Sequence, residues 1–598
     1  MCGICGELTS DGRPAALDVI NKMLPALASR GPDDQGTWQQ GPLAFGHQRL
    51  SIIDLSQKAH QPMVDTQLAL TIVFNGTIYN YPELRAQLQG LGHSFKSSGD
   101  TEVILKAYAE WGEECSKRLH GMFAFAIWDA QKQQLFMSRD RMGIKPLYYS
   151  ANKKGIRFAS NTQALLATGD IDTSLDPVAL HHQFSLHAVV PAPRTILNGI
   201  RKLPPAHNLI INSNGKQQLK RYWQLTANTD VAMSDEDWIE GVQQRLIKAV
   251  ERRIRIADVP VGVLLSGGLD SSLLVGLLHQ AGVADIKTFS IGFEDHPEEK
   301  GNEFEYSDPL AAHFNTQHHK FHIPNAEVLP HIPDAVAHMA EPMVGQDAVA
   351  FYLLAERVAK EVKVVQSGQG ADEVFAGYFW YQQMFDSLNG AGADAASKEA
   401  WAHQFKQFYF DRSQAEMNDL LAASDGIDHS GLLVADRLQQ FGSNDFLDAV
   451  LRFDTTTLIV DDPVKRVDNM TMAWGLEARV PFLDQELVEF AANMPSRLKL
   501  SQGGKGPLKS IARGLIPDAV IDRPKAYFPM PALKYVRGEF YDFMHDILCS
   551  QAARERSLFN PAAIETLLRA PESHFTKLNG SKLWHCALLE LWLQTHTD

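Results

Sequence analysis

The chain begins Met1-Cys2, and a cysteine at the second position can act as a nucleophile. If Met1 is removed, Cys2 carries both a thiol and a free α-amino group. A terminal amine has a pKa of about 7.7–8.0, so part of it is unprotonated near neutral pH and can take the proton of the thiol. This help matters because the thiolate is the reactive form and a free thiol has a pKa of about 8.5. The start of the chain therefore predicts N-terminal nucleophile chemistry.

Seven motifs follow Cys2 in order, and the series resembles the glutaminase domain of class II glutamine amidotransferases. The motifs lie at residues 30–34, 46–54, 74–76, 78–80, 99–102, 121–125 and 139–146. The resemblance implies that Cys2 attacks the side-chain amide of glutamine. It also implies a glutamine-binding set of Arg49, Leu50, Ser51, Ile52, Ile53, Asn75, Gly76, Thr77 and Asp100.

Four of these residues also have a direct chemical interpretation. Thioester formation from glutamine passes through a tetrahedral oxyanion that needs two preorganised donors. Asn75 offers a side-chain amide and Gly76 permits close approach of the backbone, and in the family these two form the oxyanion hole. Arg49 offers a planar fork for the α-carboxylate of glutamine, and Asp100 offers a counter-charge for its amine.

Thr77 departs from the family pattern. The family usually carries a glutamate after Asn-Gly, and that glutamate helps to hold the amino group of glutamine. Threonine has no charge to offer. We therefore expect glutamine binding to depend more strongly on Asp100 and to be weaker.

A second centre of chemistry is the turn Leu265-Ser266-Gly267-Gly268-Leu269-Asp270-Ser271-Ser272, which follows an expected strand at 259–265 and opens an expected helix. The backbone N–H groups of a glycine-rich turn and of a helix N-terminus bind anions, and the three serine hydroxyls add donors. Asp270 would repel a phosphate unless a cation lay between them, which implies Mg²⁺. No Gly-Lys-Ser/Thr follows, so this is not a Walker motif. The order matches the pyrophosphate loop of enzymes that split ATP into AMP and pyrophosphate.

Motifs further along extend the resemblance over nearly the whole chain. Residues 288–293, 364–378, 468–473, 477–484, 503–509 and 523–525 are similar, in this order, to the synthetase half of glutamine-hydrolysing asparagine synthetases. The resemblance implies that Lys505 lies near the leaving pyrophosphate and the acyl-adenylate, and that Asp270 and Asp372 bind Mg²⁺. The expected ATP contacts are Leu265, Ser266, Gly267, Gly268, Asp270, Ser271, Ser272, Ile291, Ser367 and Gly368.

Gln369 is a second departure, because asparagine synthetases carry a glutamate at this adenylate-site position. Glutamine is nearly isosteric with glutamate but takes up no proton at physiological pH. An acid–base role here is therefore lost, or it moves to another carboxylate such as Asp372 or Glu373. The change disfavours aspartate as the acceptor without disturbing the ATP chemistry.

Three stretches are more similar to one subgroup, the bacterial N-acetylglutaminylglutamine amidotransferases. They are residues 181–194, residues 341–347 and the motif around Gln369. Those enzymes amidate the C-terminal carboxylate of an acetylated dipeptide and so make an osmoprotectant. The resemblance implies this acceptor, and an asparagine synthetase acting on aspartate is the alternative.

Composition excludes several other classes of protein. The formal net charge of −15 argues against a nucleic-acid partner, and no apolar run approaches the roughly 18 residues of a membrane span. The N-terminus has no basic stretch followed by an apolar one, so we expect a cytoplasmic enzyme without a signal peptide. Cys2 and Cys5 have a two-residue gap, but no second pair exists among the five cysteines, so the cysteine pattern does not favour zinc.

The hydrophobic pattern divides the chain near its middle. Residues 2–205 read as short strands with turns and two amphipathic helices, residues 206–236 as a connecting segment, and residues 237–598 as helices and then alternating strands and helices. With the resemblance, the fold class is a two-domain α+β and α/β protein. We expect an N-terminal nucleophile glutaminase domain (an αββα sandwich) and an ATP-pyrophosphatase synthetase domain with a parallel sheet. A homodimer is compatible with this family.

Together the two centres predict glutamine-dependent, ATP-dependent amidation of a carboxylate acceptor through an acyl-adenylate, with Mg²⁺ as cofactor. Adenylation is needed because the oxygen of a carboxylate is a poor leaving group. One rival class is a pyrophosphate-loop enzyme acting on tRNA, which the acidic charge and the N-terminal motifs disfavour. The other is a regulatory protein that binds nucleotides without turnover, and only Thr77 and Gln369 support it.

Overall fold

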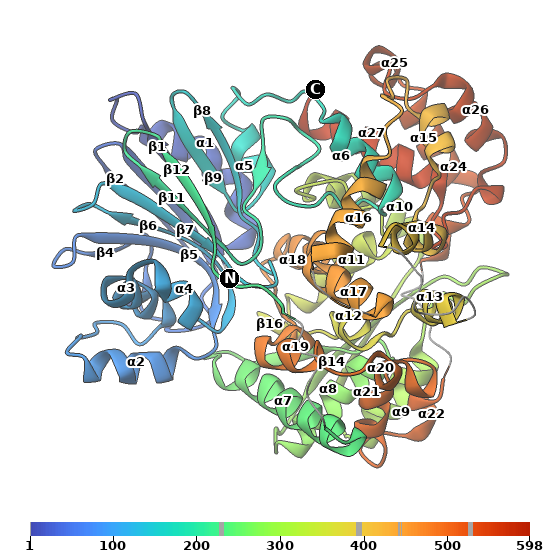
Figure 1. The fold of residues 1–598 in the computed structure, drawn as a ribbon, viewed down its shortest axis with the longest axis horizontal. Coiled ribbons are helices and arrows are strands. Elements are labelled where there is room, and N and C mark those ends of the chain that lie inside the picture. The colour runs from blue at the N-terminus through green and yellow to red at the C-terminus, as the bar shows by residue number, and fades with distance from the viewer. Residues whose placement is uncertain (1, 227–232, 390–397, 441–442, 444, 524–529) are drawn as a thin grey trace.

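The computed structural model describes residues 2–226, 233–389, 398–440, 443, 445–523 and 530–598. It contains an N-terminal domain of two stacked antiparallel sheets and a C-terminal domain built on a parallel sheet (Figure 1). The two domains lie side by side in this view, and the fold class predicted from the sequence is confirmed.

Two six-stranded sheets form the centre of the N-terminal domain. The first has the order β10 (Arg201–Lys202), β8 (Tyr148–Asn152), β9 (Gly155–Ala159), β1 (Cys2–Thr9), β3 (Leu43–Arg49) and β2 (Asp34–Gln40). The second has the order β12 (Gln217–Arg221), β11 (His207–Asn212), β7 (Gln134–Arg139), β6 (Gly121–Asp129), β5 (Leu70–Ile78) and β4 (Met63–Asp65). Helix α1 (Leu17–Met23) packs on the first sheet and α3 (Asp100–Trp111) on the second, which gives the αββα sandwich.

Strand β1 is buried along its whole length, which explains its apolar character. Ile4 points into the core between the two sheets, and Cys5 points toward α1, where it packs with Ile20 and Met23. A strand that is covered on both faces needs mainly apolar or small residues, and the one carboxylate of β1, Glu7, is paired with Arg157 at 2.9 Å. The nucleophile at the first position of β1 is therefore held by a rigid central strand.

The predicted connecting segment 206–236 is not all linker. Strands β11 and β12 lie in its first half, and β11 pairs with β7, so they extend the second sheet of the N-terminal domain. The turn at 212–215 is the hairpin between these strands, since the N–H of Gly215 donates to the carbonyl of Asn212. Turn residues mark a hairpin as readily as a linker, which is why the sequence placed the boundary too early. Residues 227–232 of this segment lie outside the described residues.

A five-stranded parallel sheet organises the C-terminal domain. Its order is β15 (Gln317–Ile323), β14 (Lys287–Phe293), β13 (Val261–Leu264), β16 (Val364–Gln366) and β17 (Glu477–Arg479). Helix α7 (Asp235–Arg255) precedes it and starts with a capping box between Ser234 and Asp237. Helix α8 (Leu269–Gln280) follows β13 after the glycine turn. In a parallel sheet of this kind, ligands bind beyond the carboxyl ends of the strands.

Buried ion pairs join the two domains. Asp468 of helix α18 (Lys465–Met472) accepts from Arg30 at 2.9 Å and from Lys145 at 3.1 Å, and all three side chains are almost fully buried. Lys202 contacts Glu341 at 2.9 Å and Asp461 at 2.6 Å in the same interior. Removing one partner from such a pair typically costs about 3–5 kcal/mol, so these contacts hold the domains in one arrangement.

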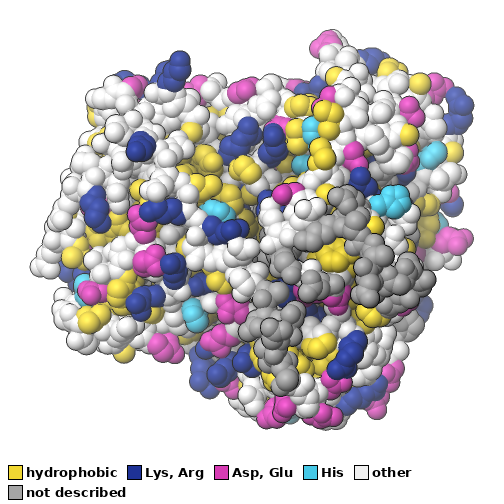
Figure 2. Space-filling model, in the orientation of Figure 1, with side chains coloured by type: hydrophobic (Ala, Val, Ile, Leu, Met, Phe, Trp, Pro, Cys, Tyr) yellow, Lys and Arg dark blue, Asp and Glu magenta, His cyan; other side chains and the backbone are white. Residues whose placement is uncertain are grey.

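The outer surface carries charges of both signs. On the face seen in Figure 2, acidic and basic side chains are interspersed rather than gathered by sign. Among the described helices, none has both the length and the apolar content that a bilayer crossing requires.

Candidate active sites

The first site forms where β1 begins beside β5. The backbone nitrogen of Cys2 donates to Oδ1 of Asn75 at 3.1 Å. The Nδ2 of the same amide is buried and has no hydrogen-bond partner among the described residues. A buried, unsatisfied donor is costly unless something accepts from it. The geometry therefore offers an N–H group beside the nucleophile where an oxyanion can be held.

Gly76 is a glycine because two strands meet closely at this point. Its φ is 154°, and a Cβ atom there would lie 2.2 Å from the carbonyl oxygen of Met122 on β6. A side chain would push β5 away from β6 and would displace Asn75, the neighbour of Gly76. The glycine thus allows the backbone to approach the site.

A small cavity of about 30 Å³ lies against the thiol of Cys2. Its lining includes the expected residues Arg49, Leu50, Ile52, Ile53, Gly76, Thr77 and Asp100. Ser51 is not among the lining residues, and its backbone N–H instead donates to Asp33 at 2.7 Å. The guanidinium of Arg49 is oriented by the backbone carbonyls of Asp54 and Ser56.

The electrostatics of this cavity depend on burial. Burial raises the pKa of the Cys2 thiol, so the thiol needs a base to become a thiolate. Burial also raises the pKa of Asp100 to about 6, with a further contribution from the nearby carboxylate of Glu477. Asp100 accepts from the N–H of Ile78 at 3.0 Å, which fixes its carboxylate at the start of α3.

Glu477 belongs to the other domain, yet it lines the Cys2 cavity. It lies on β17, is fully buried, and accepts from the hydroxyl of Thr77 at 3.3 Å. Although burial opposes ionisation, Arg479 at 2.5 Å helps to lower the pKa of Glu477 to about 2, so its carboxylate is charged. The carboxylate that is absent at position 77 is thus supplied next to Thr77 from the C-terminal domain.

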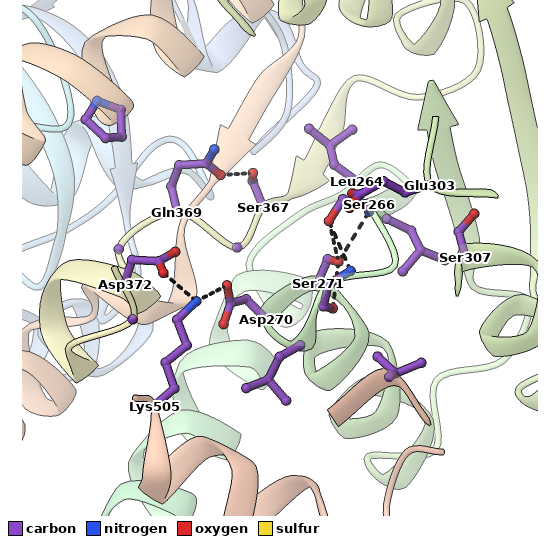
Figure 3. Close-up of a pocket in the computed structure, with 18 of the residues that line it drawn as sticks. Leu264, Ser266, Asp270, Ser271, Glu303, Ser307, Ser367, Gln369, Asp372 and Lys505 are labelled. Carbon is purple, nitrogen blue, oxygen red and sulfur yellow. Dashed lines mark hydrogen bonds and ion pairs between the residues drawn. The ribbon is translucent and has the colours of Figure 1, made fainter. Parts of the chain in front are cut away.

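The second site is a cavity of about 500 Å³ beyond the carboxyl ends of β13, β14 and β16 (Figure 3). This volume lies within the ~300–1,000 Å³ that small-molecule sites usually have. Of the residues expected to contact ATP or Mg²⁺, the lining includes Leu265, Ser266, Gly268, Asp270, Ser271, Ile291, Ser367, Gly368, Asp372 and Lys505.

Two residues of the predicted loop do not line this cavity. Gly267 has a φ of 75°, and a Cβ atom there would lie 2.7 Å from the backbone nitrogen of Ser307. The glycine therefore allows the turn to pack against the chain at Ser307. Ser272 is fully buried inside α8 and is not part of the cavity lining. The sequence cannot separate loop residues that face a ligand from those that support the turn.

Lys505 bridges the two carboxylates that were expected to bind Mg²⁺ (Figure 3). Its ammonium lies 2.6 Å from Asp270 and 2.9 Å from Asp372. Burial alone would lower the pKa of Lys505, but the two carboxylates raise it above its ordinary value. Gly377 leaves room for this arrangement, because a Cβ atom there would lie 2.1 Å from Cε of Lys505.

The same carboxylates are suited to a divalent cation. They come from different elements and converge on one positive charge, and carboxylate oxygens are the ligands that Mg²⁺ prefers. The ammonium of Lys505 lies between these two carboxylates, where a positive charge balances them.

A second chamber of about 180 Å³ adjoins the large cavity and shares Asp347, Glu373, Tyr378, Pro463 and Arg466 with it. Aromatic rings form part of its wall, with Tyr378 stacked on Trp380 at 4.2 Å between ring centroids. Another side is a pair of π-helical turns, Asp454–Leu458 and Val460–Val464. Such turns are rare and often occur at functional sites.

Arg466 stands at the boundary between the two chambers and was not predicted from the sequence. It pairs with Asp347 at 3.1 Å and with Asp462, and these contacts orient its guanidinium. Near it, Gln369 lines the larger cavity and accepts a hydrogen bond from the hydroxyl of Ser367. The sequence signal for Arg466 was weak because it lies two residues before the motif 468–473.

Comparison with known proteins agrees with this architecture. A family model for the glutamine amidotransferase domain matches residues 1–223, and a model for asparagine synthase matches residues 241–594. The chain belongs to the glutamine-hydrolysing asparagine synthetase family. It is therefore a glutamine-hydrolysing amidotransferase and ligase.

Full-length relatives differ in the activity that their names state. The chain is 30% identical to asparagine synthetase 3 of Bacillus subtilis, over 100% of this chain and 99% of the relative. It is 29% identical to asparagine synthetase 1 of the same organism, over 99% of this chain and 96% of the relative. It is also 27% identical to an amidase of Gibberella zeae, over 92% of each chain.

We expect Cys2→Ala to reduce glutaminase turnover by ~10³-fold or more, since the thiol that is expected to form the thioester is lost. Synthesis from added ammonium salts should continue, because the ATP cavity is untouched. The matched control is Cys5→Ala, which alters a buried thiol on the same strand that does not line the cavity. Glutamine-dependent synthesis by the Cys2 variant would show that the nucleophile is wrongly assigned.

Glu477→Gln should raise the KM for glutamine about tenfold, which corresponds to about 1.4 kcal/mol. The amine of glutamine would lose a carboxylate, leaving Asp100 as its counter-charge. Since Asp100 is protonated below pH 6 or so, the KM should rise as the pH falls through that value. Removing the charge of Glu477 should shift this rise to lower pH. Steady-state kinetics over a pH series measure both effects, and unchanged ammonia-dependent synthesis would show that the variant is folded. An unaltered KM and pH profile would contradict the role of Glu477.

Lys505→Ala or Asp270→Asn should lower the formation of AMP and pyrophosphate by ~100-fold or more. The first variant loses a positive charge that can bind developing negative charge, and the second loses a carboxylate that is suited to Mg²⁺. Glutaminase turnover should persist at least in part, because the Cys2 cavity lies in the other domain. Lys509→Ala is a control, as this lysine lines the cavity but contacts neither carboxylate in the described hydrogen bonds. Formation of ADP and phosphate instead of AMP and pyrophosphate would refute the assignment of the loop.

Proposed function

We propose that this enzyme amidates the C-terminal carboxylate of N-acetylglutaminylglutamine, with glutamine as nitrogen source and ATP as activator, and so makes an osmoprotectant. Aspartate is the alternative acceptor, since relatives of similar length are named asparagine synthetases. One observation favours the dipeptide over aspartate: each of the three sequence stretches that resemble the subgroup contributes residues to the walls of the two chambers. His187, residues 344–347 and Gln369 all lie in their walls.

In the proposed first half-reaction, Cys2 attacks the side-chain amide of glutamine. Its free α-amino group takes the thiol proton, which is needed because burial raises the pKa of the thiol. The Nδ2 of Asn75 donates to the oxyanion, while Arg49 and Asp100 hold the α-carboxylate and the α-amine. Ammonia leaves, and water hydrolyses the thioester.

In the proposed second half-reaction, the acceptor carboxylate attacks the α-phosphate of ATP. The 266–271 turn and the N-terminus of α8 bind the phosphates through N–H and hydroxyl groups. Asp270 and Asp372 would hold Mg²⁺, which neutralises phosphate charge when it is bound. Lys505 then contacts the departing pyrophosphate rather than the two carboxylates. Ammonia displaces AMP from the adenylate, in a cavity that limits access of water.

We infer that the second chamber receives a blocked dipeptide, whose side chains are uncharged, rather than aspartate. Its wall combines aromatic rings with the side-chain amides of Gln346 and Asn579, which can pair with the amide side chains of such an acceptor. Burial raises the pKa of Asp454 well above its ordinary value, while Asp347, Glu373 and Asp462 add further carboxylates to the same wall. Arg466 lies at the boundary between the two chambers and can hold the one carboxylate that a blocked dipeptide presents.

Side-by-side pyrophosphate-release kinetics with the two acceptors test the proposal. We expect a kcat/KM at least tenfold higher for N-acetylglutaminylglutamine than for aspartate, because mismatched buried charges cost ~1–3 kcal/mol. Gln369→Glu should impair the dipeptide reaction, since it places a charge where Ser367 now donates to a neutral amide. Efficient turnover of aspartate, with none of the dipeptide, would assign the protein to the ordinary asparagine synthetases.

Trp380→Ala sharpens this test, because the tryptophan lines only the second chamber. Loss of its ring should raise the KM for the dipeptide about tenfold, or ~1.4 kcal/mol, and should leave glutaminase turnover unchanged. Trp401→Ala is the matched control: Trp401 is buried in the same hydrophobic cluster but is not part of the chamber wall. Equal effects of the two variants on the KM would mean that the chamber does not receive the acceptor.

A further inference from the structure

Three buried side chains meet at one edge of the second chamber. His187 follows helix α6 (Pro177–Ser185), Asp411 lies between α14 (Lys398–Tyr409) and α15 (Gln414–Leu420), and His585 lies on α27 (Lys582–His596). One ligand atom from each lies within 4.8 Å of the other two. Segments that are far apart in the chain thus place two imidazoles and one carboxylate together.

Several polar atoms of this cluster are buried without a hydrogen bond. His585 is fully buried, and neither of its ring nitrogens has a hydrogen-bond partner among the described residues. Asp411 is 3% exposed, and its Oδ1 atom also has no hydrogen-bond partner among the described residues. Leaving a polar atom unsatisfied in the interior costs about 1–3 kcal/mol. A bound ion would satisfy one ring nitrogen of His585 and the carboxylate of Asp411.

The distances fit a small divalent ion. Nδ1 of His187 lies 2.9 Å and Nδ1 of His585 lies 3.7 Å from Oδ2 of Asp411. Ligands bound tetrahedrally to zinc at 2.0–2.1 Å are about 3.3 Å apart, a value between these two distances. Small side-chain adjustments would therefore bring the three atoms into one coordination sphere.

The surrounding chain keeps this arrangement in place. His187 and Ala188 both have left-handed backbone conformations, with φ of 54° and 62°, which cost non-glycine residues about 1–2 kcal/mol each. The N–H of Asp411 donates to the carbonyl of Ser185 at 3.0 Å, which ties its loop to α6. A Cβ atom on Gly580 would lie only 3.1 Å from Nε2 of His585, so the glycine keeps the space beside the rings open.

We propose that His187, Asp411 and His585 bind a divalent transition-metal ion, of which Zn²⁺ is the best match, at the edge of the second chamber. Imidazole ligands select such ions, whereas Mg²⁺ prefers oxygen ligands. The three protein ligands leave a fourth position open, and since His187 and Gly580 line the chamber, that position borders it. Cysteine spacing gives no sign of this site, because its ligands are two histidines and an aspartate.

Metal analysis of the full-length enzyme tests the site. The protein is stripped with a chelator, dialysed against Zn²⁺ in the presence of excess Mg²⁺, and its metal content is measured by mass spectrometry. We expect about one Zn²⁺ per chain, as for a site with three protein ligands. His187→Gln and His585→Ala should each weaken binding by at least tenfold. His182→Asn is the matched control, because this buried histidine on α6 contacts Ser430 instead of Asp411.

Two further measurements keep the result interpretable. Substitution with Co²⁺ in the wild-type enzyme should give the visible absorption bands of a four-coordinate ion with nitrogen ligands, so the test does not depend on the folding of a variant. Asp372→Asn should retain the metal, which separates this site from the ATP cavity. A wild-type enzyme that retains no Zn²⁺ and shows no Co²⁺ bands would overturn the proposal. So would equal metal retention by the wild type and both ligand variants.

Discussion

The buried carboxylate of Asp468 is the interaction on which the rest of the structure depends. Asp468 lies on α18 of the C-terminal domain, and its carboxylate forms ion pairs with Arg30 and Lys145 of the N-terminal domain. A buried charge is tolerated only with well-placed partners. Loss of either partner of Asp468 would therefore lower the stability by several kcal/mol. An amidotransferase needs that rigidity, because ammonia released in one domain must meet a reactive ester in the other before water does. The two ion pairs thus hold the domains in the fixed arrangement that ammonia transfer between them requires.

Neighbouring strands connect the two sites directly. β16 and β17 are paired in parallel, with Gln366 opposite Arg479. β16 runs into Ser367 and Gln369 of the ATP cavity, while Glu477 on β17 lines the Cys2 cavity. Glu477 at the start of β17 and Ser367 after the end of β16 thus connect the two cavities through one pair of strands. A displacement of β17 would therefore alter both cavities together.

Contiguous motifs could be located from the sequence, whereas sites assembled across the fold could not. Cys2 and the 266–271 turn carry their chemistry within a few neighbouring residues, so their types and order are informative. Glu477 was read as part of a synthetase motif, and only the sheet order places it against Thr77. The second chamber could not be predicted from the sequence for the same reason, since its walls come from segments that are hundreds of residues apart in the chain. Periodicity predicts a strand or a helix, but it does not say which distant strand will be its neighbour.

The two family departures have different physical outcomes, and the difference argues against a degenerate protein. At Thr77 a carboxylate lies beside the uncharged side chain, because the ionised Glu477 accepts a hydrogen bond from the hydroxyl of that threonine. At Gln369 the charge is replaced by a neutral amide that accepts from Ser367, so the position stays ordered but takes no proton. Loss of function would leave such sites without compensating contacts. Here Thr77 and Gln369 both keep ordered polar contacts, which is the pattern expected of an active enzyme.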